Sequence, residues 1–102
     1  MQKLLRKFSP LFIAKVKEKS MEPFLKEGDE IIVKKYIFTK PKIGDIIIFR
    51  HSTPPFIFIK RVLKIKDSNY WVEGDNKNKS FDSRSFSYIK KDSVLGKMIS
   101  KI

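Results

Sequence analysis

Short runs of apolar and β-branched residues alternate with polar turns along most of this chain, a pattern typical of strands rather than of long helices. The runs rich in Ile, Val, Phe and Tyr cover residues 11–16, 30–37, 45–49, 56–66, 70–73 and 94–102. Turn-forming residues separate them at 26–29, 41–45, 52–55 and 67–69. The pattern predicts a mainly β protein with a compact antiparallel fold, and helix only at 2–8 and in a turn after Ser20.

The segment 56–66 is the longest predicted strand. Its first half, Phe56-Ile57-Phe58-Ile59, is apolar at every position, whereas its second half alternates. We therefore expect a strand that enters the core with both faces buried and then leaves it. Lys60 follows the apolar half directly, so its amine either is buried among apolar side chains or extends along them to solvent.

The length and composition are those of one globular domain spanning residues 1–102. The chain has a mass of 12.0 kDa and 41% hydrophobic residues, with four glycines and five prolines. It contains no cysteine, which excludes disulfides and thiol nucleophiles. One histidine, His51, cannot hold a metal ion alone, and its Pro-rich surroundings predict a solvated histidine in a hairpin loop. We therefore expect neither a metal nor a cofactor.

The formal charge is +12 at pH 7, and such a positive field attracts nucleic acid, anionic lipid or acidic protein surfaces. Lysines are spread from Lys3 to Lys101 in runs of no more than two, which indicates a generally basic surface. Peripheral contact with an anionic membrane or a membrane-anchored partner is therefore expected in preference to nucleic-acid binding. No apolar run approaches the roughly 18 to 20 residues of a transmembrane helix, so we expect a cytoplasmic or peripherally membrane-associated protein.

A candidate nucleophile precedes Met21-Glu22-Pro23, where the proline restrains the backbone and should place Ser20 at the edge of a constrained turn. A serine hydroxyl needs a base at neutral pH, and His51, a carboxylate or a desolvated lysine could serve. Lys60 has the most suitable context, because burial lowers the pKa of an amine from about 10.4 toward 7 or 8. A shift of three units costs about 4 kcal/mol, so a buried lysine points to a function.

A polar block runs from Gly74-Asp75-Asn76 to Ser80-Phe81-Asp82-Ser83-Arg84. Taken singly, its residues could cap turns or form a surface ion pair worth under about 1 kcal/mol. Taken in order with Ser20 and Lys60, they supply the separate parts of a Ser/Lys acyl-transfer site.

These blocks together resemble those of the bacterial-type signal peptidase I family of Ser/Lys endopeptidases. The family's Ser-Met-x-Pro is matched by Ser20-Met21-Glu22-Pro23, its Lys-Arg-Val by Lys60-Arg61-Val62, and its Gly-Asp-Asn-x-x-x-Ser-x-Asp-Ser-Arg by residues 74–84. The resemblance covers residues 20–97 and is most specific in the last block.

The resemblance implies a signal-peptidase-like β-fold with Ser20 as the nucleophile and Lys60 as the general base. Ser80 would orient the lysine amine through a hydrogen bond. Supporting roles in the loop would belong to Asp75, Asp82 and Arg84.

The implied activity is removal of a leader or signal segment from a protein substrate through an acyl-enzyme on Ser20. Met21 and Pro23 would border a cleft for small side chains near the scissile bond. Because only residues 61–73 separate the lysine and Gly-Asp-Asn blocks, we expect a minimal catalytic core without the inserted second domain of larger members. It looks most similar to the short soluble branch that includes nickel-type superoxide dismutase maturation proteases.

Three positions depart from the family pattern. Glu18 stands where members commonly have a small hydroxyl residue that donates to the oxyanion, Phe24 replaces a threonine, and Ser87 replaces a glycine. Two other functions therefore stay open: a small basic β-barrel that binds nucleic acid or an anionic surface, and a peptidase fold with impaired catalysis.

Overall fold

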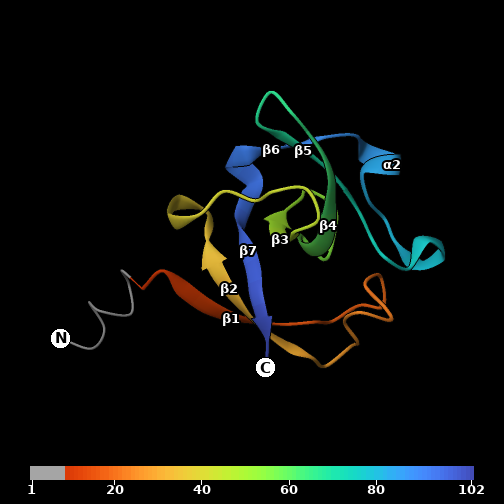
Figure 1. Cartoon of the computed structure of the whole chain (residues 1–102). Helices are drawn as coiled ribbons and strands as arrows, with labels where there is room; N and C mark the ends of the chain where they lie inside the picture. The colour runs from red at the N-terminus through yellow and green to blue at the C-terminus, as the bar shows by residue number, and fades with distance from the viewer. Residues whose placement is uncertain (1–8) are drawn as a thin grey trace.

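The computed structural model describes residues 9–102, so the helix expected over residues 2–8 lies outside the described part. Within that part the chain forms one antiparallel sheet in the order β1-β2-β7-β3-β4-β5-β6 (Figure 1). Its strands are β1 (Leu11–Lys15), β2 (Glu30–Lys35), β3 (Ile46–Arg50), β4 (Ile57–Lys66), β5 (Asn69–Glu73), β6 (Ile89–Lys90) and β7 (Val94–Lys101). The helical turns are η1 (Tyr36–Phe38), η2 (Lys77–Lys79), α2 (Ser83–Phe86) and η3 (Lys91–Ser93). The mainly β, antiparallel fold is confirmed.

β3 is the strand buried on both faces. Ile47 and Phe49 belong to one apolar cluster, whereas Ile46 and Ile48 belong to the other, because successive side chains of a strand point to opposite sides. The first cluster also takes residues from β4, β5, β6 and β7, and the second takes residues from β2 and the loop that follows β1. β3 therefore connects the two halves of the core.

β4 departs from the expected burial on both faces. Its first half alternates, with Phe58, Lys60 and Val62 buried and Ile57 exposed. Residues 64–66 are exposed, so the strand does leave the core as expected. Lys60 therefore occupies an inward position of a regular alternation rather than the end of a run buried on both faces.

Two turns of the same sequence type, residues 26–29 and 42–45, precede β2 and β3. In each, the aspartate N–H donates to the carbonyl of the first residue at 3.0 Å, and that residue's N–H donates to the aspartate carboxylate at 2.8 Å. The glycine of each turn has a φ of 93° or 96°, which other residues rarely adopt. Lys101 and Lys97 of β7 then form ion pairs with the two aspartates, at 3.2 and 3.3 Å.

The polar stretch after β5 folds into η2 and α2 before the chain pairs again as the two-residue β6. Neither α2 nor β6 was expected from the pattern of apolar positions. No helix within residues 9–102 is long and apolar enough to span a membrane.

Candidate active site

Ser20 lies in the loop between β1 and β2, at the start of a tight turn as the sequence predicts. Glu22 N–H donates to the Lys19 carbonyl at 3.1 Å, and Leu25 N–H donates to the Met21 carbonyl at 2.9 Å. Met21 and Leu25 are buried in the second apolar cluster and anchor this turn, and Ser20 itself is only 3% exposed.

The Gly-Asp-Asn loop after β5 holds the Ser20 turn through hydrogen bonds from Asn76 to two main-chain carbonyls. Asn76 N–H donates to the Ser20 carbonyl at 2.8 Å, and the Asn76 side-chain amide donates to the Lys19 carbonyl at 3.1 Å. In Figure 1 the loop after β1 and the segment after β5 meet on the same side of the sheet. Asn76, which the sequence analysis named as part of the Gly-Asp-Asn block but gave no separate role in the site, therefore connects this block to the Ser20 turn.

Gly74 allows these segments to approach closely. A Cβ at this position would lie 2.5 Å from the Ser20 carbonyl oxygen and would collide with the Ser80 side chain. Real side chains do not pack at such distances, so only glycine fits between Ser20 and Ser80.

Lys60 is 1% exposed, which excludes the alternative that its amine extends to solvent. It lies on β4 between buried Phe58 and Val62, and its Nζ is 5.4 Å from the centre of the Phe58 ring. Burial lowers the pKa of the Lys60 amine, because the charged form loses its hydration. The negative charges of Glu18 and Asp82 partly oppose this shift, and the positive charge of Arg84 adds to it.

Ser80 and Asp82 form a hydrogen-bonded network around Gly74. The Ser80 hydroxyl donates to Asp82 at 2.6 Å, and Gly74 N–H donates to both the Ser80 Oγ at 3.1 Å and the Asp82 carboxylate at 2.9 Å. A hydroxyl oxygen accepts two hydrogen bonds, so Ser80 retains one acceptor site for an amine.

Asp82 is fully buried and ionised. Burial by itself would raise its pKa, but hydrogen bonds from Arg84, Ser80 and Gly74 hold the pKa at about 2. The Arg84 guanidinium donates to both carboxylate oxygens, at 2.9 and 3.0 Å, and to the Lys77 carbonyl at 2.8 Å. The pair expected as a possible surface contact therefore joins an exposed guanidinium to a fully buried carboxylate within the loop.

Asp75 is fixed by Arg61, the residue after the predicted base. The guanidinium donates to both Asp75 oxygens at 2.9 Å and to the Gly44 carbonyl at 2.7 Å. It also lies 5.1 Å from the centre of the Phe24 ring. Arg61 thus joins β4 to the Gly-Asp-Asn loop and to the Ser20 turn, a role that its place in the Lys-Arg-Val block could have suggested.

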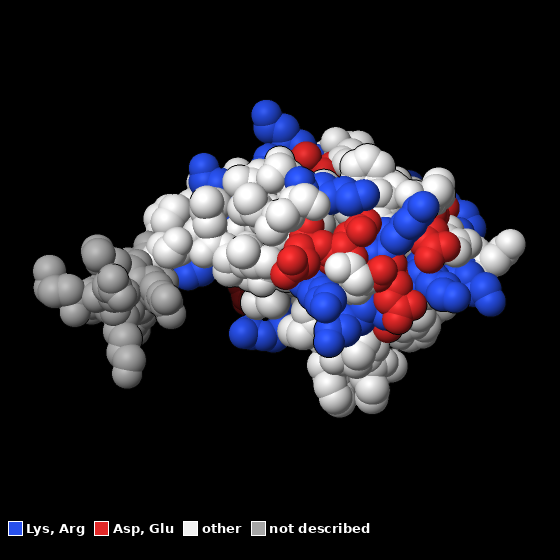
Figure 2. All heavy atoms as spheres, turned by 90° about the horizontal axis from the view of Figure 1, so that it is seen from below, with Lys and Arg blue, Asp and Glu red and all other residues white. Residues whose placement is uncertain are grey.

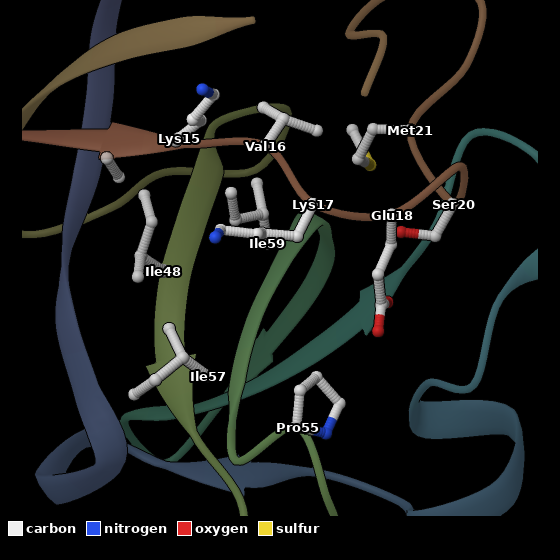
Figure 3. Close-up of a pocket in the computed structure, with 11 residues that line it drawn as sticks. Lys15, Val16, Lys17, Glu18, Ser20, Met21, Ile48, Pro55, Ile57 and Ile59 are labelled. Atoms are coloured by element: carbon white, nitrogen blue, oxygen red, sulfur yellow. The ribbon is translucent and has the colours of Figure 1, made fainter. Parts of the chain in front are cut away.

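A cleft of about 380 Å³ opens beside Ser20 (Figure 3). Its lining is largely apolar and consists of Ala14, Lys15, Val16, Lys17, Glu18, Ser20, Met21, Ile48, Pro55, Ile57 and Ile59. Of the two predicted cleft residues, Met21 lines it, whereas Pro23 is exposed and lies outside it. Glu18 extends into the cleft from the residue two places before Ser20 (Figure 3).

The predicted nucleophile and base are not directly bonded. Within residues 9–102, the hydrogen bonds of Ser20 are made by its main chain, and none joins its hydroxyl to the Lys60 amine. Hydrogen bonds between catalytic groups are often long or misaligned before substrate binds and tighten only in the complex.

His51 is in the expected hairpin loop but is not a fully solvated residue. Its ring packs against Phe86, Phe58 and Phe81, with centroid distances of 4.3, 5.6 and 5.9 Å, and its Nδ1 accepts from the Thr53 N–H at 3.2 Å. Across residues 9–102, no group of three His, Cys, Asp or Glu side chains gathers as metal ligands would.

Comparisons with known proteins give one family and two relatives. The sequence model of the family described as Peptidase S24-like matches residues 1–99. The chain is 25% identical over 132 residues to "Thylakoidal processing peptidase 1, chloroplastic" of Arabidopsis thaliana, with 78% of this chain and 38% of the relative covered. It is 26% identical over 127 residues to "Probable signal peptidase I-1" of Synechocystis sp., with 76% of this chain and 63% of the relative covered.

The chain thus spans less than two thirds of the length of each of these curated relatives. Both alignments are longer than the chain itself, so the relatives carry inserted residues that this chain lacks.

Proposed function

The chain belongs to the Peptidase S24-like family, and from that premise we propose that it is a serine endopeptidase that uses Ser20 as nucleophile and Lys60 as general base. The observation that carries the proposal is the burial of the Lys60 amine on an inward position of β4, where its pKa is lowered. An unused buried lysine would cost a small domain much of its stability.

The proposed reaction begins when the neutral Lys60 amine takes the proton of the Ser20 hydroxyl as Oγ attacks the peptide carbonyl carbon. The lysine ammonium then gives that proton to the leaving amine as the C–N bond breaks, which leaves an ester on Ser20. In the second half, Lys60 takes a proton from water as the water oxygen attacks the ester, and Ser20 recovers its proton as the new carboxyl end leaves.

Several contacts favour this arrangement. The remaining acceptor site of Ser80 suits a donor such as the lysine amine, and Asp82 holds the Ser80 hydroxyl in position. The Ser20 carbonyl accepts a hydrogen bond from the Asn76 N–H, and this bond fixes the turn. The Ser20 N–H is proposed to donate to the oxyanion from that fixed position.

The substrate proposed for this site is a protein leader or signal segment with small side chains near the scissile bond. The largely apolar lining of the cleft beside Ser20 is consistent with such a segment. Cleavage of a leader from a particular protein, and docking to a membrane surface, are parts of the same proposal.

A serine-directed phosphonylating probe tests the nucleophile. We expect a fluorophosphonate to add one adduct to the wild-type protein at Ser20, located by peptide mass mapping. Ser20→Ala should abolish the adduct, and Lys60→Met should slow its formation at least about 1,000-fold near neutral pH.

Replacement of His51, the other side chain that was considered as the base, is the control. His51→Asn should retain labelling, because its imidazole lies in an aromatic cluster and Lys60 is proposed to act instead. Folding of each variant is checked by circular dichroism. An unlabelled wild-type protein across neutral and alkaline pH, or full labelling of Lys60→Met, would reject the proposed dyad.

A further inference from the structure

Among the side chains of residues 9–102 that line the cleft, Glu18 is the one that is acidic. The other lining side chains are apolar or basic, apart from Ser20. In Figure 3 the Glu18 carboxylate extends into the cleft toward Pro55, and the Lys17 side chain extends into it in another direction, toward Ile59. The Lys15 side chain points away from the cleft. A single negative charge thus stands beside the predicted nucleophile in a largely apolar surface.

The carboxylate of Glu18 belongs to none of the six ion pairs within residues 9–102, whose acids are Asp29, Asp45, Glu73, Asp75 and Asp82. Water can solvate this exposed group while the cleft is empty. A bound peptide would displace that water, and a carboxylate covered by apolar groups is costly unless a positive charge faces it. The Lys60 amine, whose pKa the Glu18 charge raises, is neutral when it acts as the proposed base and so does not supply that charge.

The distribution of charge makes this a local effect. The chain as a whole carries a formal charge of +12, so its long-range field disfavours a strongly basic substrate. A short-range carboxylate next to the reacting atoms instead selects where along a peptide one basic side chain is placed, because charge complementarity governs register and specificity.

We propose that Glu18 is a specificity-determining residue that binds one lysine or arginine side chain of the substrate close to the scissile bond. Glu18 is two residues from Ser20, and an extended peptide advances roughly 3.3 Å per residue. The basic side chain therefore lies within about three residues of the bond that is cut. This inference rests on the proposed function for its scissile bond but concerns the cleft alone.

Peptide binding to Ser20→Ala tests the inference without cleavage. The probes are fluorescein-labelled alanine-rich peptides in which lysine or norleucine occupies one position within three residues of a central alanine pair. Norleucine has the four side-chain carbons of lysine without its amine. Fluorescence anisotropy at low ionic strength should show at least about 5-fold tighter binding of one lysine peptide than of its norleucine counterpart.

Charge changes at Glu18 then decide the cause. On the Ser20→Ala background, Glu18→Gln should remove the preference for lysine, and Glu18→Lys should transfer the preference to a peptide with glutamate at that position. Glu27→Gln is the matched control, because Glu27 is exposed and lies outside the cleft, and it should keep the lysine preference.

The outcomes separate the two proposals. Equal binding of the lysine and norleucine peptides at every position, or a lysine preference that survives Glu18→Gln, would overturn the inference. If binding to Ser20→Ala shows the Glu18-dependent preference but wild-type protein cleaves none of the peptides, the proposed function fails and the inference stands. If wild-type protein cleaves lysine and norleucine peptides with equal kcat/KM, the inference alone fails.

Discussion

Lys60 shows how a single position determines the chemistry available to this site. Its amine replaces an apolar side chain in the inward alternation of β4, and it is almost completely buried. The sequence could identify this lysine through its block but left open whether the amine is buried. In the folded chain Lys60 lies opposite Ile47 of β3, and only 1% of the residue is exposed.

The pH dependence of the proposed reaction follows from the same residue. Burial lowers the pKa of Lys60 and the Glu18 charge raises it, and the amine acts as a base only when neutral. Glu18→Gln should therefore move the acid limb of kcat/KM for an uncharged peptide to lower pH. An unmoved limb, with Glu27→Gln again as control, would mean that Glu18 does not act on the base.

The low pKa of Asp82 predicts how the stability of the fold changes in acid. Its pKa is about 2 when folded against an ordinary 3.8, so its ionised form stabilises the fold by about 2 kcal/mol. The folded pKa is the lower one, so this contribution is complete above about pH 5 and is lost as pH falls through 3.8 toward 2. Asp82→Asn should lower the urea midpoint at pH 7 and flatten its decline in acid. A decline as steep as that of the wild type would contradict the assignment.

Ser87 predicts a stabilising substitution. At the end of α2 it has φ 67° and ψ −159°, a backbone conformation that is found almost only for glycine. The signal peptidase I family, which the sequence resembles, commonly has glycine at this position. Ser87→Gly should raise the free energy of unfolding by about 1 kcal/mol, measured by urea denaturation. Ser85→Gly, inside α2, is the control and should destabilise.

At the scale of elements, the strands were predictable because they alternate or carry β-branched residues. The predicted runs at 11–16, 30–37, 45–49, 56–66, 70–73 and 94–102 each overlap one strand of the sheet, although residues 36–38 form η1. β6 and α2 were missed. Two residues are too few to show a period, and α2 depends on the Asp82 side chain that caps its first turn by accepting from Arg84 N–H.

Substitution of two glycines distinguishes a catalytic role of the loop between β5 and α2 from its contribution to the stability of the fold. A Cβ at Gly74 would meet Ser20 and Ser80, and one at Gly96 would meet the β2 backbone at Lys34, so Gly74→Ala and Gly96→Ala should both destabilise. Under conditions in which both variants are folded, Gly74→Ala should lower kcat at least about 10-fold, because it displaces groups next to Ser20. Gly96→Ala should retain kcat. Equal kcat values for the two variants would show that the contact at Gly74 only supports the fold.

At the scale of the whole molecule, the charge is dispersed. Figure 2 shows acidic side chains lying among basic ones on the face that it presents. The formal charge of +12 nevertheless creates a positive field that salt screens within about 10 Å at 0.1 M. Mixed surface charge with a large net excess predicts attraction over distance rather than one localised binding patch.

Ionic strength should therefore affect substrates according to their net charge. An acidic peptide should bind Ser20→Ala at least about 10-fold more weakly when salt rises from roughly 0.05 to 0.5 M, mainly through slower association. A neutral peptide of the same length is the control and should change little. Equal salt dependence of both peptides, measured by stopped-flow fluorescence, would contradict the long-range effect.

The sequence by itself determined the antiparallel strands, the absence of thiol chemistry and the identity of the candidate residues, because these depend on side-chain type and on short-range periodicity. Tertiary structure decided which groups lie together. Asn76 reaches the Ser20 carbonyl across 56 residues of chain, Arg61 clamps Asp75, and Glu18 becomes the wall of a cleft. Such contacts form because the loops after β1 and β5 pack against each other at Gly74. The pattern of apolar and polar residues within either loop does not predict this packing.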